Sequence, residues 1–296
     1  MEPKLQRRIQ RYGWDLAAQA YEPLWQAQLA GVQDELLACA ALAPGEHVLD
    51  VACGTGLVAL AAADCVGPSG RVSGIDLSGK MVDAAQRRAQ SLGLANVDFA
   101  RMDAENLDLP DASFDVVLCA LGLMYMPDPE RAVQEMRRVL RPGGRVVIAV
   151  WGERSRCGWS SVFAVVDAEV SSDVCPLFFR LGHAGALARL CAGASLEVTA
   201  ERRIAAALVY ADGHDACNAA LAGGPVALAW SRFDDEVRAR VRARYLESIE
   251  SWRIGQGYGV PAEFVVVGAE AAGARGLRPN RRVGAPDHAG KLLDLP

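Results

Sequence analysis

Two acidic side chains stand where the chain leaves a short apolar run. Asp50 precedes a turn of small residues, 52–56, and Asp76 ends the next apolar run, 20 residues beyond Gly56. Small residues in such a turn let the backbone approach a ligand closely, and the helix that follows offers free N–H groups. A carboxylate about 20 residues further along can accept hydrogen bonds from both hydroxyls of a ribose. These residue types at this spacing indicate a site for an adenosine-containing cofactor.

The turn itself leaves alternatives open. A glycine turn also occurs as plain architecture in doubly wound proteins, without any ligand. The dinucleotide fingerprint is Gly-x-Gly-x-x-Gly, whereas this turn reads Ala-x-Gly-x-Gly, with an acid two residues ahead of it. The spacing therefore disfavours a nicotinamide-dependent oxidoreductase, which we keep as an alternative.

The elements that must position these residues follow an alternating pattern. Short β-branched apolar runs predict strands at 47–51, 71–75, 97–100, 114–120 and 145–151, and helical periodicity appears at 57–65, 79–92 and 129–140. Strands that alternate with helices are typical of a parallel sheet built from βαβ units. Further strands are predicted at 196–210 and 264–267, with a helix at 233–252 between them.

Five ordered blocks carry a family resemblance: residues 48–56, 74–78, 102–110, 113–119 and 137–144. In order and spacing they resemble class I S-adenosylmethionine (SAM) dependent methyltransferases, in the branch that contains the ubiquinone and menaquinone biosynthesis methyltransferases and many small-molecule methyltransferases. The match is strong over about 40–152 and loose on the flanks. It implies an α/β, Rossmann-like, doubly wound and mostly parallel seven-stranded sheet, with N-terminal helices and a helical cap insertion.

The resemblance also implies a cofactor and its binding residues. SAM would bind here and leave as S-adenosylhomocysteine (SAH). Asp50, Ala52, Gly54 and Gly56 would lie beside the methionine part, although the family often has glycine where this chain has Ala52. The remaining positions implied at the cofactor are Asp76 at the ribose, Leu77 and Met81 at the adenine, Asp103 and Ala104 at the adenine edge, and the backbone of Cys119 at the methionine ammonium.

Aromatic residues suggest where a methyl acceptor would lie. Tyr125 follows the fourth strand and is the candidate catalytic contact, because related sequences often carry histidine near this point and this chain does not. An N-terminal segment with Tyr12, Trp14, Tyr21 and Trp25 could fold over the cofactor and form one wall of the acceptor pocket, with Tyr21 as the first choice. Aromatic residues at helical spacing also occur simply as core, and that interpretation stays open for them and for Tyr125.

The chain divides by pattern into five segments. We expect an N-terminal helical cap at 1–45, a SAM-binding core at 46–152, a cap insertion at 153–195, C-terminal strands with intervening helices at 196–270, and a disordered tail at 271–296. The insertion and the segment 196–252 would supply the other wall of the acceptor pocket, which favours an apolar or aromatic acceptor.

Composition limits the partners. The chain has 296 residues, 51% of them hydrophobic, and a net charge of -5 with no long basic run, which argues against a nucleic-acid surface. No apolar run approaches the roughly 18 residues of a membrane span, and no export signal is evident, so we expect a cytoplasmic location. The eight cysteines form no Cys-x-x-Cys pair, and no metal site is expected. The oligomeric state stays open, with a homodimer as one option.

These observations predict an enzyme that transfers a methyl group from SAM to an O or C nucleophile of a small organic molecule. The methyl group of a sulfonium is already activated, so alignment of the acceptor and exclusion of water can supply much of the catalysis. A thiol or metalloid acceptor is kept as an alternative because of the cysteine count. A SAM-binding protein without catalysis of its own, acting as a partner or regulatory subunit, would carry the same cofactor motifs.

Overall fold

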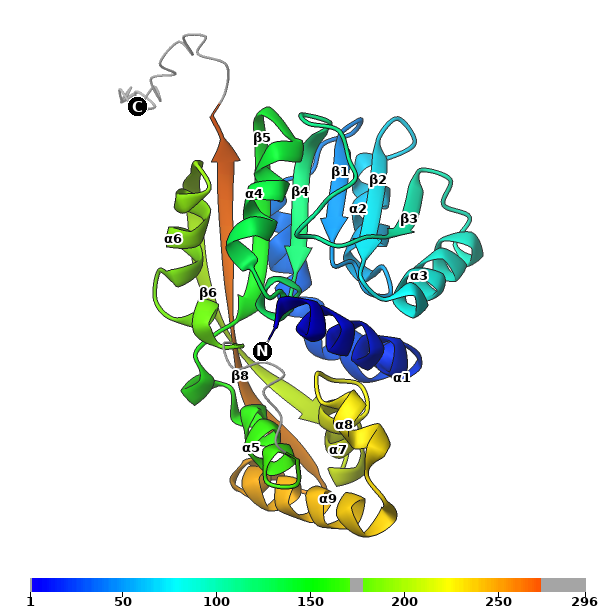
Figure 1. Ribbon diagram of the computed structural model, residues 1–296, viewed down its shortest axis with the longest axis vertical. Coiled ribbons are helices and arrows are strands. Elements are labelled where there is room, and N and C mark those ends of the chain that lie inside the picture. The colour runs from blue at the N-terminus through cyan, green and yellow to red at the C-terminus, as the bar shows by residue number, and fades with distance from the viewer. Residues whose placement is uncertain (1, 171–177, 273–296) are drawn as a thin grey trace, which may run out of the picture.

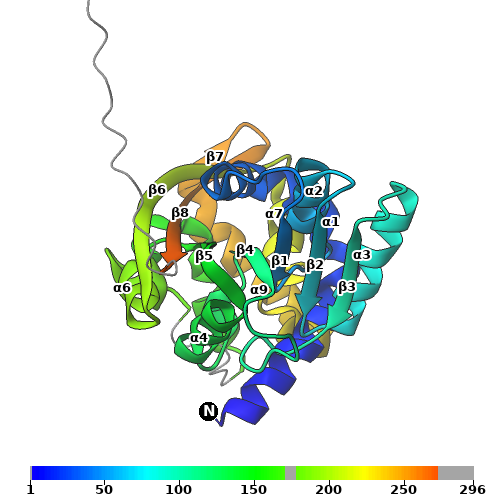
Figure 2. The same cartoon turned by 90° about the horizontal axis from the view of Figure 1, so that it is seen from above.

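The computed structural model describes residues 2–170 and 178–272 and shows one mixed β-sheet with helices on both faces (Figures 1 and 2). Five strands run parallel to one another: β1 (His47–Val51), β2 (Arg71–Asp76), β3 (Val97–Arg101), β4 (Phe114–Ala120) and β5 (Leu140–Trp151). The strand order β3-β2-β1-β4-β5-β8-β6 contains seven strands, and the short β7 pairs with β8 beside it. The predicted Rossmann-like seven-stranded sheet is confirmed, with one short strand added.

The second part of the sheet is antiparallel. The long strand β8 (Gly257–Ala271) lies between β5 and β6 (Leu196–Tyr210), and β7 (Arg253–Ile254) forms a tight hairpin with the start of β8. The sequence predicted only residues 264–267 as the final strand. Pro261 and Glu263 weaken the strand pattern before that point, yet Pro261 pairs with Ala207 in the ladder.

Helices α2 (Leu57–Val66), α3 (Gly79–Ser91) and α4 (Pro129–Val139) connect the parallel strands. Ser78 begins α3 by accepting a hydrogen bond from the Met81 N–H at 3.1 Å, and Asp128 begins α4 in the same way. Figure 2 shows α4 on one face of the sheet and α2 on the other. These caps and faces explain why the predicted helices end within two residues of the observed ones.

The N-terminal segment forms one continuous helix, α1 (Pro3–Ala40), where helices in the plural were expected. It runs through Pro23, and residues of its second half, including Leu29, Val32 and Leu36, are buried in the core. Figure 1 shows the first half of α1 crossing below the carboxyl ends of β1, β2 and β4. One element thus both covers the sheet and reaches the edge where ligands bind in such folds.

Five further helices surround the long antiparallel strands. α5 (Ser161–Asp167) and α6 (Ala186–Gly193) lie in the predicted insertion, and α9 (Asp235–Ile249) corresponds to the helix predicted at 233–252. The pattern had not placed α7 (Gly213–Leu221) and α8 (Ala227–Arg232). Single 3-10 turns complete the described elements: η1 (Leu123–Tyr125), η2 (Arg154–Arg156), η3 (Gly158–Ser160), η4 (Arg180–Gly182) and η5 (Glu250–Trp252).

In Figure 1, α5, α7, α8 and α9 gather around the far ends of β6 and β8, on the other side of α1 from the parallel strands. The predicted tail from residue 271 falls outside the described residues beyond position 272. Across the described ranges, no helix is long and apolar enough to cross a membrane.

Candidate active site

A cleft opens between the carboxyl ends of the parallel strands and the first half of α1. The strand order reverses between β1 and β4, which is the point where open α/β sheets bind ligands. The space between the walls of the cleft, open solvent included, is about 770 Å³. Its walls are the turn after β1, the end of β2, the loops after β3 and β4, and α1.

The turn after β1 has the left-handed conformation that small residues permit. Gly54 has φ of 55° and Gly56 has φ of 84°, and Ala52 adopts φ of 58° although it carries a side chain. The neighbouring loop makes room for the Ala52 methyl, because a Cβ at Gly122 would lie 2.4 Å from the Cβ of Ala52. The chain therefore keeps the tight turn with alanine in place of the glycine frequent in the family.

Asp76 is held at the end of β2 by backbone groups. Its two carboxylate oxygens accept hydrogen bonds from the Gly54 N–H at 2.9 Å and the Ser78 N–H at 2.8 Å. Burial raises the pKa of Asp76 to about 6, although these backbone donors oppose the shift. The carboxylate has lone pairs to spare, so it can also accept hydroxyl hydrogens from a ribose in the cleft.

Asp50 lies behind the cleft wall and has no such support. It is 1% exposed, and neither carboxylate oxygen has a hydrogen-bond partner in the described part of the chain. The other buried acids, Glu105, Glu135 and Glu263, all face arginines. Burial, followed by the charge of Asp76, raises the pKa of Asp50 to about 8. A buried carboxylate without a partner suits a cationic ligand nearby, and SAM carries positive charge on its sulfonium and its ammonium.

The structure brings most of the predicted cofactor residues to this one cleft. Its lining includes Tyr21, Ala52, Gly54, Asp76, Leu77, Met81, Asp103, Ala104 and Tyr125. Asp50, Gly56 and Cys119 are not part of the lining. Gly56 packs against Phe99. Cys119 is fully buried, and the next residue in the chain, Ala120, lines the cleft.

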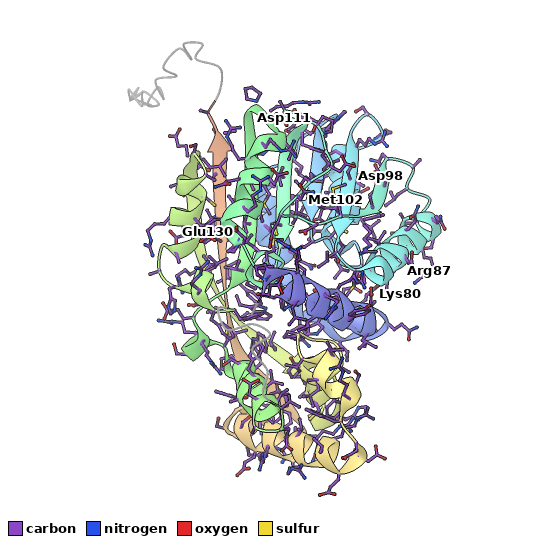
Figure 3. All side chains as sticks on the ribbon, viewed as in Figure 1. Lys80, Arg87, Asp98, Met102, Asp111 and Glu130 are labelled. Carbon is purple, nitrogen blue, oxygen red and sulfur yellow. The ribbon has the colours of Figure 1, made fainter. Side chains whose placement is uncertain are left out.

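Helix α1 contributes polar residues that the sequence had not singled out. Arg7 lies in the cleft wall, contacts the buried Glu105 and lies 3.2 Å from an oxygen of Asp103. Asp15 accepts a hydrogen bond from the Ser78 hydroxyl at 2.6 Å and another from the backbone N–H of Lys80, which Figure 3 labels at the start of α3. The first half of α1 is therefore tied to the loops on both sides of the cleft. Arg7 lies four residues after the start of α1 and belongs to no sequence motif that could have revealed this contact.

A second, smaller compartment adjoins the cleft, and Trp14, Tyr21, Leu121 and Tyr125 line both spaces. Beyond these shared residues its walls come from α1, from the end of β5, from η3 and from the loop between α7 and α8. They are Trp25, Leu29, Trp151, Trp159, Gly223, Gly224 and Pro225. Of the N-terminal aromatic residues expected here, Tyr12 is the exception: its side chain is exposed and stacks with Arg11.

Edge-to-face and tilted ring contacts fix the rings of this second compartment, which we call the aromatic compartment. Trp14 lies 5.1 Å from Tyr125, Trp25 lies 6.1 Å from Trp151, and Trp159 lies 4.7 Å from Trp151, between ring centroids. Such geometry is favourable for aromatic pairs. The lining named above includes no carboxylate, imidazole, amine, guanidinium or thiol, so the compartment suits a neutral and largely apolar group.

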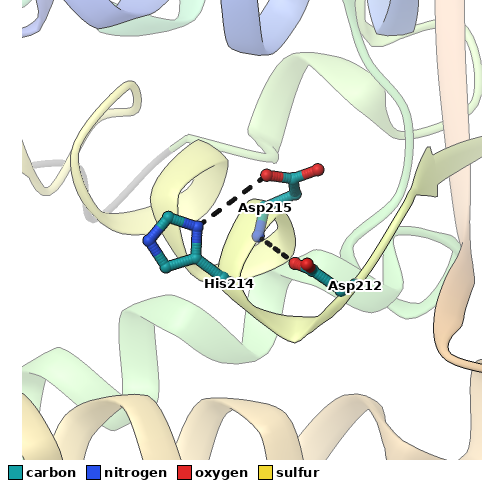
Figure 4. A group of neighbouring side chains, drawn as sticks. All are labelled: Asp212, His214 and Asp215. Carbon is teal, nitrogen blue, oxygen red and sulfur yellow. Dashed lines mark hydrogen bonds and ion pairs between the residues drawn. The ribbon is translucent and has the colours of Figure 1, made fainter.

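Two other groups of reactive residues lie away from these spaces. Asp212, His214 and Asp215 come close enough together to hold a metal ion, but Asp212 serves as the cap of α7 by accepting from the Asp215 N–H at 2.9 Å (Figure 4). Burial raises the pKa of Cys157 and of Cys217 to about 11, so both thiols stay protonated at neutral pH. Cys175 falls outside the described residues.

The central segment of the chain is similar to known proteins. Residues 48–144 match the family model described as a methyltransferase domain. A demethylmenaquinone methyltransferase from Geobacillus sp. (strain WCH70) is 37% identical over 119 residues, which are 40% of this chain and 51% of that protein. The chain thus spans about half the length of the curated relatives it matches.

Solved structures share the fold at low identity. A putative methyltransferase from Bacillus halodurans C-125 superposes with a TM-score of 0.59 at 21% identity, covering 81% of this chain and 98% of that one. The [4+2]-cyclase SpnF superposes with a TM-score of 0.58 at 23% identity, covering 84% of this chain and 83% of that one.

The strand order and the position of the cleft are therefore those of a Rossmann-like methyltransferase. More particularly, the chain contains a class I SAM-dependent methyltransferase domain, distantly homologous to the demethylmenaquinone methyltransferases. SAM is the cofactor that this class of domain implies.

Proposed function

We propose that the protein transfers the methyl group of SAM to an oxygen or carbon atom of a small, neutral, apolar or aromatic molecule. The observation that carries the proposal is the aromatic compartment, which adjoins the cofactor cleft and shares four lining residues with it. In this proposal the cleft holds SAM and the aromatic compartment holds the acceptor.

The roles of the cleft residues in SAM binding follow from their positions. Asp76 accepts hydrogen bonds from the ribose hydroxyls, and Gly54 allows the backbone to approach the methionine part. Leu77 and Met81 pack against the adenine, whose amino group donates to Asp103. Tyr21 lies 4.0 Å from the position of a Cβ at Gly54 and closes the cleft from the side of α1. Burial and the nearby Asp76 raise the pKa of Tyr21, so its hydroxyl stays neutral.

The chemistry that these walls support is alignment rather than strong base catalysis. SAM supplies an activated methyl group. The residues of the aromatic compartment hold a planar acceptor in line with that methyl group and exclude water. Because the walls offer no carboxylate or imidazole, the best acceptor is one that binds in its neutral form and readily loses a proton to solvent as the methyl group is transferred, such as an enolisable carbonyl compound or a phenol. Tyr125, at the junction of the two spaces, is the residue we assign to acceptor contact.

The relatives point to one acceptor class for testing. Their name specifies demethylmenaquinone, but the homology covers 40% of this chain, and the matching family model ends at residue 144, before Trp151, Trp159 and Gly223 of the aromatic compartment. A thiol or metalloid acceptor is a weaker candidate, because the described cysteines do not line either space. We further propose a cytoplasmic protein without a nucleic-acid partner.

A radiolabel assay tests the proposal. The protein is incubated with SAM labelled in the methyl group and with 1-naphthol, 1,3-cyclohexanedione or 2-mercaptoethanol, and label is counted in the extracted acceptor. We expect transfer to the naphthol or to the dione in preference to the thiol. A protein that binds SAM but transfers no label to any of the three acceptors would contradict this proposal.

A second candidate function is a reaction on the bound molecule without methyl transfer. It is favoured by one comparison, since a [4+2]-cyclase shares this fold. Mass spectrometry of the unlabelled acceptor separates the two candidates. Methyl transfer adds 14 mass units, the mass of one CH₂, whereas a cyclase would change the acceptor without this addition.

A further inference from the structure

The aromatic compartment contains two polar groups that the fold leaves unpaired. The indole Nε1 atoms of Trp25 and Trp159 are buried and have no hydrogen-bond partner among the described residues. Trp25 is 4% exposed and Trp159 is 1% exposed. An indole N–H can only donate, and leaving a buried donor unpaired costs about 1–3 kcal/mol. Two such donors beside one space are more than ordinary packing requires.

The Trp25 donor lies beside Gly223, in the wall of the compartment. A Cβ at Gly223 would lie 3.2 Å from Nε1 of Trp25, and Gly223 is part of the lining. Glycine at this position therefore leaves free the space that a side chain would fill. Trp159 lines the same compartment, with its ring centroid 6.3 Å from that of Trp25.

We propose that Trp25 and Trp159 donate hydrogen bonds to oxygen atoms of the methyl acceptor, and that the acceptor is a neutral ring compound that carries a carbonyl oxygen. The inference rests on the proposed function and adds the chemical class of its substrate. The rings of Trp14, Trp151 and Tyr125 contact the apolar part of this molecule, and the two indole N–H groups select its oxygen.

The same residues argue against a cationic acceptor. Aromatic cages do bind ammonium groups through the faces of their rings. Here, however, the unpaired polar groups of the wall are N–H donors, and the lining offers no carboxylate to balance a cation. A neutral hydrogen-bond acceptor satisfies both donors without bringing an unpaired charge into an apolar site.

The test compares 1-tetralone with tetralin, which has the same bicyclic skeleton without the carbonyl oxygen. Both are titrated into the SAH-saturated, full-length protein labelled with 15N in tryptophan, and the indole N–H signals are followed by NMR. We expect 1-tetralone to bind about fivefold or more tightly than tetralin, and to move the Trp25 or Trp159 indole proton signal downfield. The variants Trp25→Phe and Trp159→Phe assign these signals.

Variants connect the preference to the two donors. The double variant Trp25→Phe/Trp159→Phe should bind 1-tetralone and tetralin about equally tightly. Gly223→Ala keeps every ring but covers Nε1 of Trp25, and it should weaken 1-tetralone binding. Gly31→Ala serves as its control, because a Cβ at Gly31 would meet nothing within 4 Å.

Several outcomes would overturn the inference. They are equal binding of the two probes by the wild type, a preference that survives in the double variant, and failure of the wild type to bind either probe. Tighter binding of tetramethylammonium than of 1-tetralone would also overturn it. SAH affinity is measured in parallel by calorimetry. If the wild type does not bind SAH, the proposed function is refuted. If SAH binds but the probe preference differs from the one expected, only the inference about the two indoles is refuted.

Discussion

Single carboxylates at the ends of β1 and β2 differ in how the fold treats their charge. Asp76 receives two backbone N–H groups, while Asp50 is buried without a partner. Burial raises the pKa of both, to about 6 for Asp76 and to about 8 for Asp50. A cationic cofactor in the cleft would favour the ionised forms, so the site is arranged to bind positive charge most tightly when both protons have left.

We expect SAM binding to release protons at pH 7. Because the pKa of Asp50 lies near 8 in the free protein, its carboxyl is mostly protonated at pH 7, and the charge of bound SAM lowers that pKa. SAM affinity should therefore rise as the pH rises from 6 to 8. Calorimetric titrations in phosphate and in Tris, which differ in ionisation enthalpy, measure the number of protons released.

The control for this prediction is Asp50→Asn, which cannot ionise and should release fewer protons. Asp83→Asn, at an exposed position of α3, should behave as the wild type. Equal proton release by the wild type and by Asp50→Asn would show that Asp50 is not the group that responds to SAM.

A second prediction concerns the pair Ala52 and Gly122. Gly122→Ala should lower the free energy of unfolding by about 1–3 kcal/mol, because its methyl group would lie 2.4 Å from the Cβ of Ala52. Adding Ala52→Gly removes the opposing methyl group and should restore most of the loss. Urea unfolding of the wild type, both single variants and the double variant measures this coupling, and additive effects of the two changes would contradict it.

Among the elements, α1 has the most varied role. Its second half is part of the core and supplies Trp25 to the aromatic compartment, and its first half closes the cleft and supplies Trp14 and Tyr21 to both spaces. The first half is attached to the cleft through polar contacts of Arg7 and Asp15. This division suggests that the first half opens for cofactor exchange while the second half stays in place.

We predict that Asp15→Ala loosens this attachment. The variant loses hydrogen bonds from the Ser78 hydroxyl and from the Lys80 N–H, so amide exchange in residues 3–20 should become faster and SAH should dissociate sooner. The free energy of unfolding should change by about 1 kcal/mol or less. Hydrogen exchange read by mass spectrometry tests the prediction with Asp34→Ala, at an exposed position of the same helix, as the control. Unchanged exchange in Asp15→Ala would exclude Asp15 as the anchor.

The predictability of each element followed the strength of its local pattern. β1 and β4 were predicted to the residue, because buried parallel strands read as short apolar runs between turns. β8 was predicted at a fraction of its length, since Pro261 and Glu263 are poor strand residues whose places are fixed by pairing with β6 and by the ion pair of Glu263 with Arg203.

One part of the candidate site could likewise be predicted from the sequence, and the other part could not. The turn at 52–56 and Asp76 form a local motif, so their meeting in one cleft could be predicted. The aromatic compartment joins Trp25, Trp159 and Gly223, which come from segments far apart in the chain. Their spacing carries no signal, and only the packing of α1 against η3 and the loop between α7 and α8 brings them together.

On the scale of the whole molecule, the two parts of the sheet depend on each other. β5 pairs with β4 on one side and with β8 on the other, and residues 146–151 are buried throughout. Removing the C-terminal part would expose this apolar strand as a sheet edge. We propose that the segments 1–45, 46–152, 153–195 and 196–270 form one cooperative unit in which the cofactor and the acceptor lie between segments.

This proposal predicts that the fragment 46–152 does not fold alone. Without α1 and β8 it loses the cover of β5, so it should show no cooperative urea transition by circular dichroism. A fragment of residues 2–272 should unfold cooperatively at the same urea concentration as the full chain. A cooperative transition of fragment 46–152, with several kcal/mol of stability, would contradict the proposal.

The cleft at Asp76 is the proposed SAM site, and calorimetric titration of the full-length protein with SAH measures binding there. We expect saturable binding of one SAH per chain. Asp76→Asn should weaken it about tenfold to a hundredfold, because a charged hydrogen-bond acceptor is lost at the ribose. Absence of binding by the folded wild-type protein, or equal affinity in Asp76→Asn, would contradict the account.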